Sequence, residues 1–395
     1  MLRLWLIRIA LAAITFFALR TLQNALPHLI NDYIFDVMML AGINIILAVS
    51  LNLINGITGQ FSLGHAGFMA IGAYVAASFT RYAAPRLVFD PNINFALALI
   101  CGAIAAGFAG FLIGLPSLRL KGDYLAIVTL GFGQIVIAII VTIKEVGGAL
   151  GMSDIPARTN FMWLGALIIL CILTVRNLAY SSFGRAMRAV REDEIAAEAA
   201  GINTTQTKVL AFVISSAWAG IGGGLLVHYL PSFDPDTFSF LRSVEVVVMV
   251  VLGGLGSITG ATLAAILLKV MEESLRSVVG AFWVGLSLIA LGIGIAFPLH
   301  RSTLNSVKGW IRWLRGPVVA LAALILLFRY GRHWIESPDT PGNAADWLRY
   351  VIYALILIVL MLLRPQGLLG RGEIGWNWLR KRRAERLKPQ VAGNL

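Results

Sequence analysis

The side chains that usually carry acid–base, nucleophilic or metal chemistry are few and scattered in this sequence. No two histidines stand at the i, i+4 spacing of a helical metal site. Both cysteines, Cys101 and Cys171, lie inside apolar runs, which argues against a disulfide framework and against a cysteine-rich metal site. Because no His, Asp and Glu residues form a convergent set either, the sequence predicts neither an enzyme nor a metalloprotein.

The sequence also lacks the phosphate-binding loop of an ATPase. That loop follows the pattern G-x-x-x-x-G-K-[ST], in which the lysine reaches the phosphates. The nearest glycine cluster, GGLGSITG at 253–260, has no lysine. We therefore expect no cofactor on this chain and no hydrolysis of ATP by this chain alone.

Polar residues of another kind occur inside a glycine-rich apolar stretch at 52–76, NLINGITGQFSLGHAGFMAIGAYVA. Gln60, Ser62 and His65 lie in it at a depth where polar groups are costly unless partnered, and where such groups often mark a pathway. Small residues also permit tight helix packing, which is the alternative reading. We expect the stretch as a whole to line or gate a path, and His65 to be a hydrogen-bonded interior histidine.

A second glycine-rich break interrupts the apolar run 244–272. Four glycines fall within eight positions there, and each costs roughly 1 kcal/mol in a helix interior relative to alanine. The run is therefore expected to turn back on itself, either as a re-entrant loop or as two short helices. Non-helical backbone at membrane depth persists only where protein or a water-filled cavity covers it, so a place near a path and a simple packing bend both remain open. The residues predicted to line or gate the path are Gly59, Gln60, Ser62, Gly64, His65, Gln134, Gly253, Gly254 and Gly256.

The longest polar connector, 177–208, contains an amphipathic pattern. Within it, FGRAMRAVREDEIAAEAAGI at 183–202 predicts one amphipathic helix, which Gly201 would end as a C-terminal glycine. A lipid-binding helix should be basic and bulky, whereas this one is rich in acids and alanine. Docking onto a protein is therefore favoured over the membrane surface, and a solvated loop helix is the alternative.

The amino-acid composition indicates the class of fold that positions these residues. Of the 395 residues, 58% are hydrophobic and only 13% are charged, and the mean hydropathy is +0.82. Soluble domains are near 45–50% apolar and about 25% charged. The sequence thus predicts an all-α polytopic membrane protein and excludes soluble, disordered and fibrous classes.

Apolar runs long enough to cross or enter a membrane alternate with polar connectors. They lie at about 4–19, 34–55, 57–79, 93–115, 124–143, 160–176, 208–229, 244–272, 281–299, 316–330 and 348–363. The N-terminal run lacks a clear cleavage site and is read as a retained span. Small residues at four-residue spacing, as at Ala106, Gly110 and Gly114, favour a multi-helix bundle.

The net charge of +12 indicates orientation rather than nucleic-acid binding. A turn at Gly253–Gly260 places the basic loop 300–316 and the basic tail after Arg380 on the same side as the connector 177–208. A single crossing of 244–272 would put them on opposite sides. Because cytoplasmic loops collect Lys and Arg, we expect the turn and cytoplasmic termini.

Several of these motifs resemble the LivM-type permeases, the membrane subunits of ABC importers for branched-chain amino acids. They are NLINGITGQFSLGHAGFMAIGAYVA, LRLKGDYLAIVTLGFGQI, SSFGRAMRAVREDEIAAEAAGIN, KVLAFVISSAWAGIGGGL, VVLGGLGSITGATLAA and LLRPQGLLG. The resemblance runs from about Ile34 to Glu273 and resumes at Leu362. It implies about ten core transmembrane elements, a permease domain over 1–370 and a basic cytoplasmic tail over 371–395. The chain departs from the family at about 276–345, where it holds either two extra spans, 281–299 and 316–330, or one of these and a displaced native span.

The resemblance also implies partners and an inner-membrane location. The chain would pair with a LivH-like permease, two cytoplasmic ATPases and a periplasmic binding protein, and would move Leu, Ile and Val. Urea, short amides or aromatic acids are alternative substrates, and an ion-coupled secondary transporter is a remoter reading, disfavoured because Asp36 and Glu245 fall at the outer ends of their spans. The helix in 177–208 would seat in an ATPase groove, with Phe183, Gly184, Arg185, Arg188, Arg191, Glu194, Ala197, Glu198 and Gly201 as the coupling residues. The basic loop 300–316 would touch either anionic lipid or the ATPase.

Overall fold

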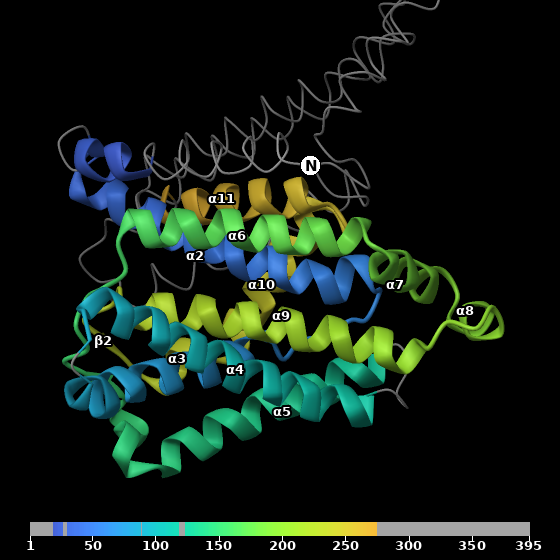
Figure 1. The fold of residues 1–395 in the computed structure, drawn as a ribbon, viewed down its shortest axis with the longest axis horizontal. Coiled ribbons are helices and arrows are strands. Elements are labelled where there is room, and N and C mark those ends of the chain that lie inside the picture. The colour runs from blue at the N-terminus through green and yellow to red at the C-terminus, as the bar shows by residue number, and fades with distance from the viewer. Residues whose placement is uncertain (1–18, 27–29, 88, 118–122, 275–395) are drawn as a thin grey trace, which may run out of the picture. The chain divides into compact units, whose positions relative to one another are not determined.

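The computed structural model describes residues 19–26, 30–87, 89–117 and 123–274 (Figure 1). Several predicted features lie outside the described residues. They are nearly all of the run 4–19, the runs 281–299, 316–330 and 348–363, the inserted region 276–345 and the tail 371–395. The described residues up to Ile266 belong to one compact unit, and the description below concerns that unit.

Helices dominate the described part of the chain, as the sequence predicts. Five of them are long and apolar enough to cross a membrane: Asp32–Ile57, Pro91–Leu115, Tyr124–Thr142, Phe161–Tyr180 and Thr204–Val227. The elements that contain these spans are α2 (Asp32–Asn52) with the π-helical turn η1 (Leu53–Ile57), α4 (Pro91–Ser117), α5 (Asp123–Thr142), α6 (Phe161–Tyr180) and α9 (Thr204–Val227). Each coincides with a predicted apolar run, which confirms the polytopic helical class for this part of the chain.

Shorter elements complete the unit. They are α3 (His65–Ser78), the turns η2 (Phe79–Ala83), η3 (Ala84–Arg86), η4 (Lys144–Val146), η5 (Gly148–Leu150) and η6 (Pro235–Phe238), the strands β1 (Met152–Ser153) and β2 (Ser232–Phe233), and the helices α7 (Ser182–Glu192), α8 (Glu194–Ala199), α10 (Phe240–Gly253) and α11 (Ile258–Ser274). The two strands pair antiparallel, with Met152 opposite Phe233.

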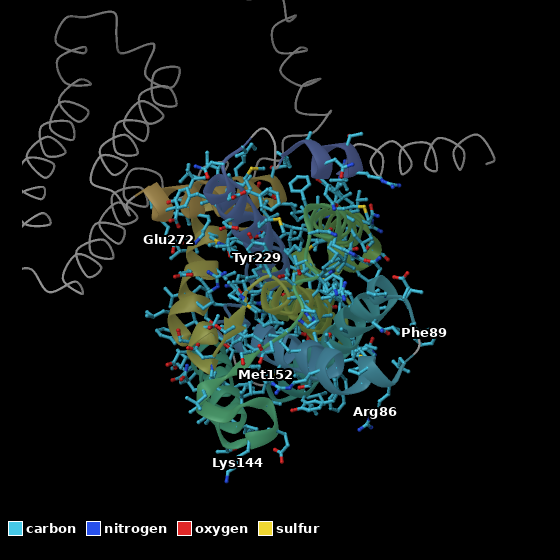
Figure 2. The ribbon with its side chains drawn as sticks, turned by 90° about the vertical axis from the view of Figure 1, so that its left-hand side faces the viewer. Arg86, Phe89, Lys144, Met152, Tyr229 and Glu272 are labelled. Carbon is cyan, nitrogen blue, oxygen red and sulfur yellow. The ribbon has the colours of Figure 1, made fainter. Side chains whose placement is uncertain are left out.

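The helices have two distinguishable ends. In Figure 1, α6 and α9 both run toward α7 and α8 at one end, while β2 lies at the other. We call the first the loop end and the second the far end. Figure 2 looks onto the far end, where Met152 and Tyr229 are labelled.

Helix α9 forms the centre of the packing, against α4, α3 and α2. Small residues allow this close approach. A Cβ on Gly220 would lie 2.6 Å from the Cβ of Ala106 on α4, and a Cβ on Gly72 of α3 would collide with the backbone of Gly220. The predicted small-residue spacings are thus helix contacts, and they hold α3 and α4 close to α9.

The run 244–272 does break at its glycines. Helix α10 ends at Gly253, and α11 begins at Ile258. Between them Gly254 and Gly256 adopt positive φ angles of 108° and 92°, which favour glycine. The run therefore consists of two short helices joined by a turn.

Candidate functional site

The first break in the helices lies between η1 and α3, and side chains satisfy its backbone. Asn55 accepts from the Ser62 amide at 3.1 Å and donates to the Ser62 carbonyl at 3.4 Å. The Leu63 amide donates to the Thr129 hydroxyl at 3.0 Å. Backbone polar groups at membrane depth require such partners. These specific side-chain hydrogen bonds therefore stabilise the non-helical backbone of the break.

The start of α3 is held deep among other helices. The His65 Nε2 lies 3.0 Å from the Ser50 hydroxyl on α2, and the Ala66 amide donates to the Ser243 hydroxyl on α10 at 3.0 Å. Since His65 is 1% exposed, its hydrogen bond agrees with the expectation of an interior histidine. His65 therefore lies in the interior of this chain and does not line an accessible surface.

The predicted path residues fall into two groups by exposure. The buried ones are Ser62, Gly64, His65, Gly253 and Gly254. The others are at least partly accessible: Gly59 and Gln134 are exposed, and Gln60 and Gly256 are half-buried. Gln134 is an exposed residue of α5. The structure thus brings Gly59, Gln60 and Gln134 to surfaces that a path or a partner subunit can reach.

The two glycine breaks meet at the loop end. The Asn52 side chain accepts from the Gly256 amide at 2.9 Å, and a Cβ on Gly56 would collide with the Gly256 backbone. Segments about 200 residues apart in sequence are therefore joined by a hydrogen bond and a contact that only glycine permits.

The connector 177–208 forms two helices, so the prediction of one continuous amphipathic helix is wrong. Asp193 is extended, with φ −157° and ψ 114°, and caps α8 by accepting from the amides of Ile195 and Ala196. Aspartate is a strong N-cap residue, and this local competition breaks the helix. The predicted end at Gly201 is confirmed, with a φ of 83° and the Ile202 amide bonded to the Ala197 carbonyl.

The break also divides the predicted apolar face. Met187 and Val190 of α7 are buried, as is Ala197 of α8. Phe183 and Ile195, in contrast, are 56% and 71% exposed. The loop therefore presents apolar side chains outward on both α7 and α8, which suits docking onto another protein.

Two of the predicted coupling residues make internal bonds. Arg188 donates to the Ala179 carbonyl at 2.9 Å and to the Gly184 carbonyl at 3.3 Å, at the end of α6 and the start of α7. Glu194 pairs with Lys208 at 2.7 Å, and the lysine side chain is only 3% exposed. Both residues therefore hold the loop to the helices. Arg185, Glu198 and Gly201 are exposed, while Gly184 packs against the Ala179 carbonyl.

Arg191, at the end of α7, connects the loop to both glycine breaks. Its Nη1 donates to the Gly56 carbonyl at 2.5 Å. A Cβ on Gly59 would lie 2.7 Å from its Cγ, and a Cβ on Gly256 would lie 2.8 Å from its Nη1. The half-buried guanidinium thus occupies space that only glycines leave free in the two breaks. This long-range contact has no signal in the sequence.

Glu245, near the start of α10, is linked through Arg242 to Asn44 of α2. Arg242 donates to the Glu245 carboxylate at 2.8 Å and to the Oδ1 of the Asn44 side chain at 2.6 Å. Asn44 follows the first residue of α2 by 12 positions, about 18 Å at 1.5 Å per residue. The acid is paired with an arginine, which differs from the free intramembrane carboxylate of an ion-coupled site.

Hydrogen bonds made by side chains join separate helices at the far end. Tyr229 donates to the Asp36 carboxylate. His228 follows the span of α9 directly; its Nδ1–H donates to the Gly224 carbonyl at 2.7 Å, so its Nε2 accepts from the Thr80 hydroxyl at 2.8 Å. Burial, more than the charge of Arg158, lowers the pKa of His228 and keeps the ring neutral.

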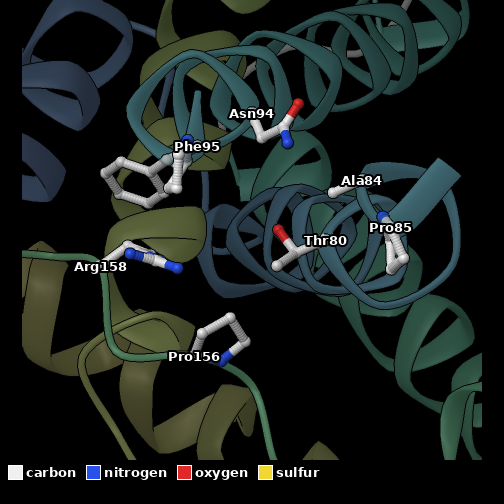
Figure 3. Close-up of a pocket in the computed structure, with 8 residues that line it drawn as sticks. Thr80, Ala84, Pro85, Asn94, Phe95, Pro156 and Arg158 are labelled. Carbon is white, nitrogen blue, oxygen red and sulfur yellow. The ribbon is translucent and has the colours of Figure 1, made fainter. Parts of the chain in front are cut away.

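A cleft of about 200 Å³ opens beside these residues at the far end (Figure 3). Thr80, Asn94, Phe95, Pro156 and Arg158 are among the residues that line it. They come from three separate segments of the chain, so no local sequence pattern predicts the cleft. Within the part of the chain that is described, no three His, Cys, Asp or Glu residues gather to hold a metal.

Comparison with known proteins adds an independent finding. The model of the family described as branched-chain amino acid transport system, permease component, matches residues 33–297. The high-affinity branched-chain amino acid transport system permease protein LivM of Escherichia coli K12 is 37% identical over 294 residues, covering 66% of this chain and 67% of that protein.

More distant relatives carry both permease names. The LivH permease protein of Salmonella typhimurium is 30% identical over 253 residues, covering 64% of this chain and 78% of that protein. The probable LivM permease of Methanocaldococcus jannaschii is 28% identical over 273 residues, covering 60% of this chain and 79% of that protein. No solved structure matches the chain significantly.

Proposed function

Because this chain belongs to the family of branched-chain amino acid transport permeases, we propose that it is the permease subunit of an ATP-binding cassette importer for leucine, isoleucine and valine. The long apolar helices and the named LivM and LivH relatives support this role. The chain supplies a path through the bacterial inner membrane, and partner ATPases supply the energy.

The partners follow from the same membership. The match to both LivM and LivH relatives supports a heterodimer with a LivH-like permease. Two cytoplasmic ATPase subunits and a periplasmic binding protein complete the importer. On this assignment the loop end faces the cytoplasm, the termini are cytoplasmic, and the cleft at the far end faces the compartment from which substrate arrives.

One observation carries the coupling mechanism: Arg191 of α7 donates to the Gly56 carbonyl inside the first glycine break. The exposed Phe183 and Ile195 are the surface that docks into an ATPase groove. Closure of the ATPases on ATP displaces α7 and α8, and the displacement reaches the breaks through Arg191. The breaks can change conformation because glycine permits backbone angles that other residues disfavour.

Alternating access is the resulting mechanism. The exposed Gly59 and Gln134 and the half-buried Gln60 form part of the wall that substrate passes. The turn at Gly253, Gly254 and Gly256 forms part of the inner gate. The buried Ser62, Gly64 and His65 hold the wall in place from behind. In this proposal the chain forms the substrate path and changes its conformation, while the partner subunits hydrolyse ATP.

The experiment is ATP-driven uptake by proteoliposomes that contain this chain with its LivH-like, ATPase and binding-protein partners. Uptake of labelled leucine that needs both the ATPase and the binding protein supports the proposal. Uptake that continues without the ATPase, driven by an ion gradient, would indicate a secondary transporter. Competition by urea, acetamide and phenylalanine tests the alternative substrates within the family.

A further inference from the structure

A polar cluster lies between α2 and α10, which pack side by side (Figure 1). It consists of Asn44, Arg242 and Glu245, and we call it the α2–α10 cluster. Arg242 is its centre, because one guanidinium nitrogen donates to Glu245 at 2.8 Å and another to the Asn44 oxygen at 2.6 Å. Neither the loop end nor the glycine breaks use these residues.

The cluster lies near the middle of the membrane. Asn44 is 12 residues into α2, about 18 Å along a helix that must cross a hydrocarbon core roughly 30 Å thick. Ionisable residues at that depth are rare and face a bundle interior or a water-filled cavity. Their presence therefore indicates a functional role for this part of the α2–α10 interface.

The cluster is also open on one side. The side chains of Arg242 and Glu245 are 17% and 31% exposed. Lipid is a poor cover for a charged pair, so the open side must face water or the partner permease. In a heterodimeric importer, a water-filled path between the two permeases provides both.

One hydrogen-bonding group of the cluster lacks an acceptor. Asn44 is 1% exposed, and its Nδ2 has no hydrogen-bond partner among the described residues. The orientation of the amide is fixed, because its oxygen accepts from Arg242. Buried donors normally have partners, so an acceptor is missing beside a guanidinium that has further N–H groups to donate.

We propose that the α2–α10 cluster binds the charged groups of an α-amino acid during transport. The α-carboxylate accepts from Asn44 and Arg242, and the α-ammonium donates to Glu245. This inference rests on the proposed function and narrows its substrate to the zwitterion. Urea and short neutral amides lack the two charges, and an aliphatic side chain contributes nothing to these contacts, which suits a path shared by leucine, isoleucine and valine.

The test uses the complete importer, with a diazirine analogue of leucine that retains both α-charges. Photolysis followed by mass spectrometry is expected to label peptides of α2 or α10. An excess of leucine should prevent the labelling, whereas isovalerate and isoamylamine, which each lack one charge, should not. Labelling that both singly charged compounds prevent equally would overturn the zwitterion assignment.

Variants separate recognition from structure. The double variant Arg242→Met with Glu245→Met removes both charges together and leaves no unpaired ion. Its leucine uptake should fall at least about tenfold, because a site built to hydrogen-bond a substrate group depends on that bond. Its ATPase should still respond to the liganded binding protein.

The matched control is Lys269→Met with Glu272→Met, which removes an ion pair of the same i, i+3 spacing from α11. This control should keep its uptake. Equal uptake by the Arg242–Glu245 double variant and the wild type would show that the pair is only structural and would overturn the inference. If the wild-type importer moves no amino acid at all, the proposed function itself fails.

Discussion

The Arg191 guanidinium donates a hydrogen bond to the Gly56 carbonyl at 2.5 Å, across 135 residues of sequence. The arginine lies in the last turn of helix α7 of the connector 177–208, and the glycine lies in the π-helical turn that precedes the first break. A part of the chain suited to contact a partner is thus bonded to the part that interrupts the helices. This bond is the structural basis of the proposed coupling.

Gly59→Ala and Gly256→Ala should each impair transport and stability. Both positions have positive φ angles, which cost an alanine roughly 1–2 kcal/mol, and both leave the new Cβ within 3 Å of Arg191. The matched control is Gly201→Ala, whose φ is also positive but whose Cβ would meet no atom within 4 Å. Thermal unfolding midpoints of the purified importer should fall further for Gly59→Ala than for the control. Equal shifts would mean that Arg191 adjusts without strain.

Ile195→Asp should weaken ATPase docking while the permease still folds. The side chain is 71% exposed on α8, and loss of an exposed apolar contact in an interface is expected to cost at least about tenfold in affinity. The control is Leu150→Asp, since Leu150 is 95% exposed at the far end. Co-purification of the ATPase with each variant measures the effect. Unchanged retention of the ATPase by Ile195→Asp would remove α8 from the interface.

Glu194→Gln should destabilise the connector by about 2 kcal/mol, because it leaves the buried Lys208 ammonium without its counterion. The neighbouring Glu198 is exposed, so Glu198→Gln serves as the control. Limited proteolysis of the connector should proceed faster only in the first variant. The same rate in both would show that the ion pair contributes little. Glu194 and Arg188 both make bonds within this chain. Substituting either residue therefore disturbs the connector itself and is a poor probe of ATPase contact.

The far end should lose stability in acid. Burial lowers the pKa of His228 below its ordinary value of 6.5, so the unfolded chain takes up the proton first. The contribution of the neutral ring is complete above pH 6.5 and is lost as the pH falls below it. His228→Gln should flatten the unfolding midpoint between pH 7 and pH 5 relative to the wild type. An equally steep decline in both proteins would assign the acid sensitivity to other groups.

The spans and the glycine turn in 244–272 could be predicted because their signals are local. Apolar runs identify α2, α4 and α9, and clustered glycines identify the turn after Gly253. The interruption at Asp193 was missed although its signal is also local: an aspartate followed by two amides that it can cap.

Other features could not be predicted, because they depend on contacts between distant segments. Nothing near Arg191 indicates that it reaches Gly56, and nothing near Glu245 indicates that Arg242 joins it to Asn44. The exposure of Gln134, in contrast with the burial of Ser62, is likewise decided by the packing of α5 and α3. Residue type alone therefore suggests candidates for a path, and the tertiary structure shows which of these candidates are exposed and which are buried.

The most direct test of the account measures leucine uptake and ATP hydrolysis together in proteoliposomes that contain the wild-type importer or its Arg191→Ala variant. Arg176→Ala, which removes an exposed arginine from α6, is the control. The account predicts that the liganded binding protein still stimulates hydrolysis in the Arg191 variant. The number of leucine molecules imported per ATP should fall at least about fivefold, which is the smallest effect that typical coupling between two sites produces. A ratio equal to that of the wild type would contradict the proposal that Arg191 transmits the movement of the connector to the glycine breaks.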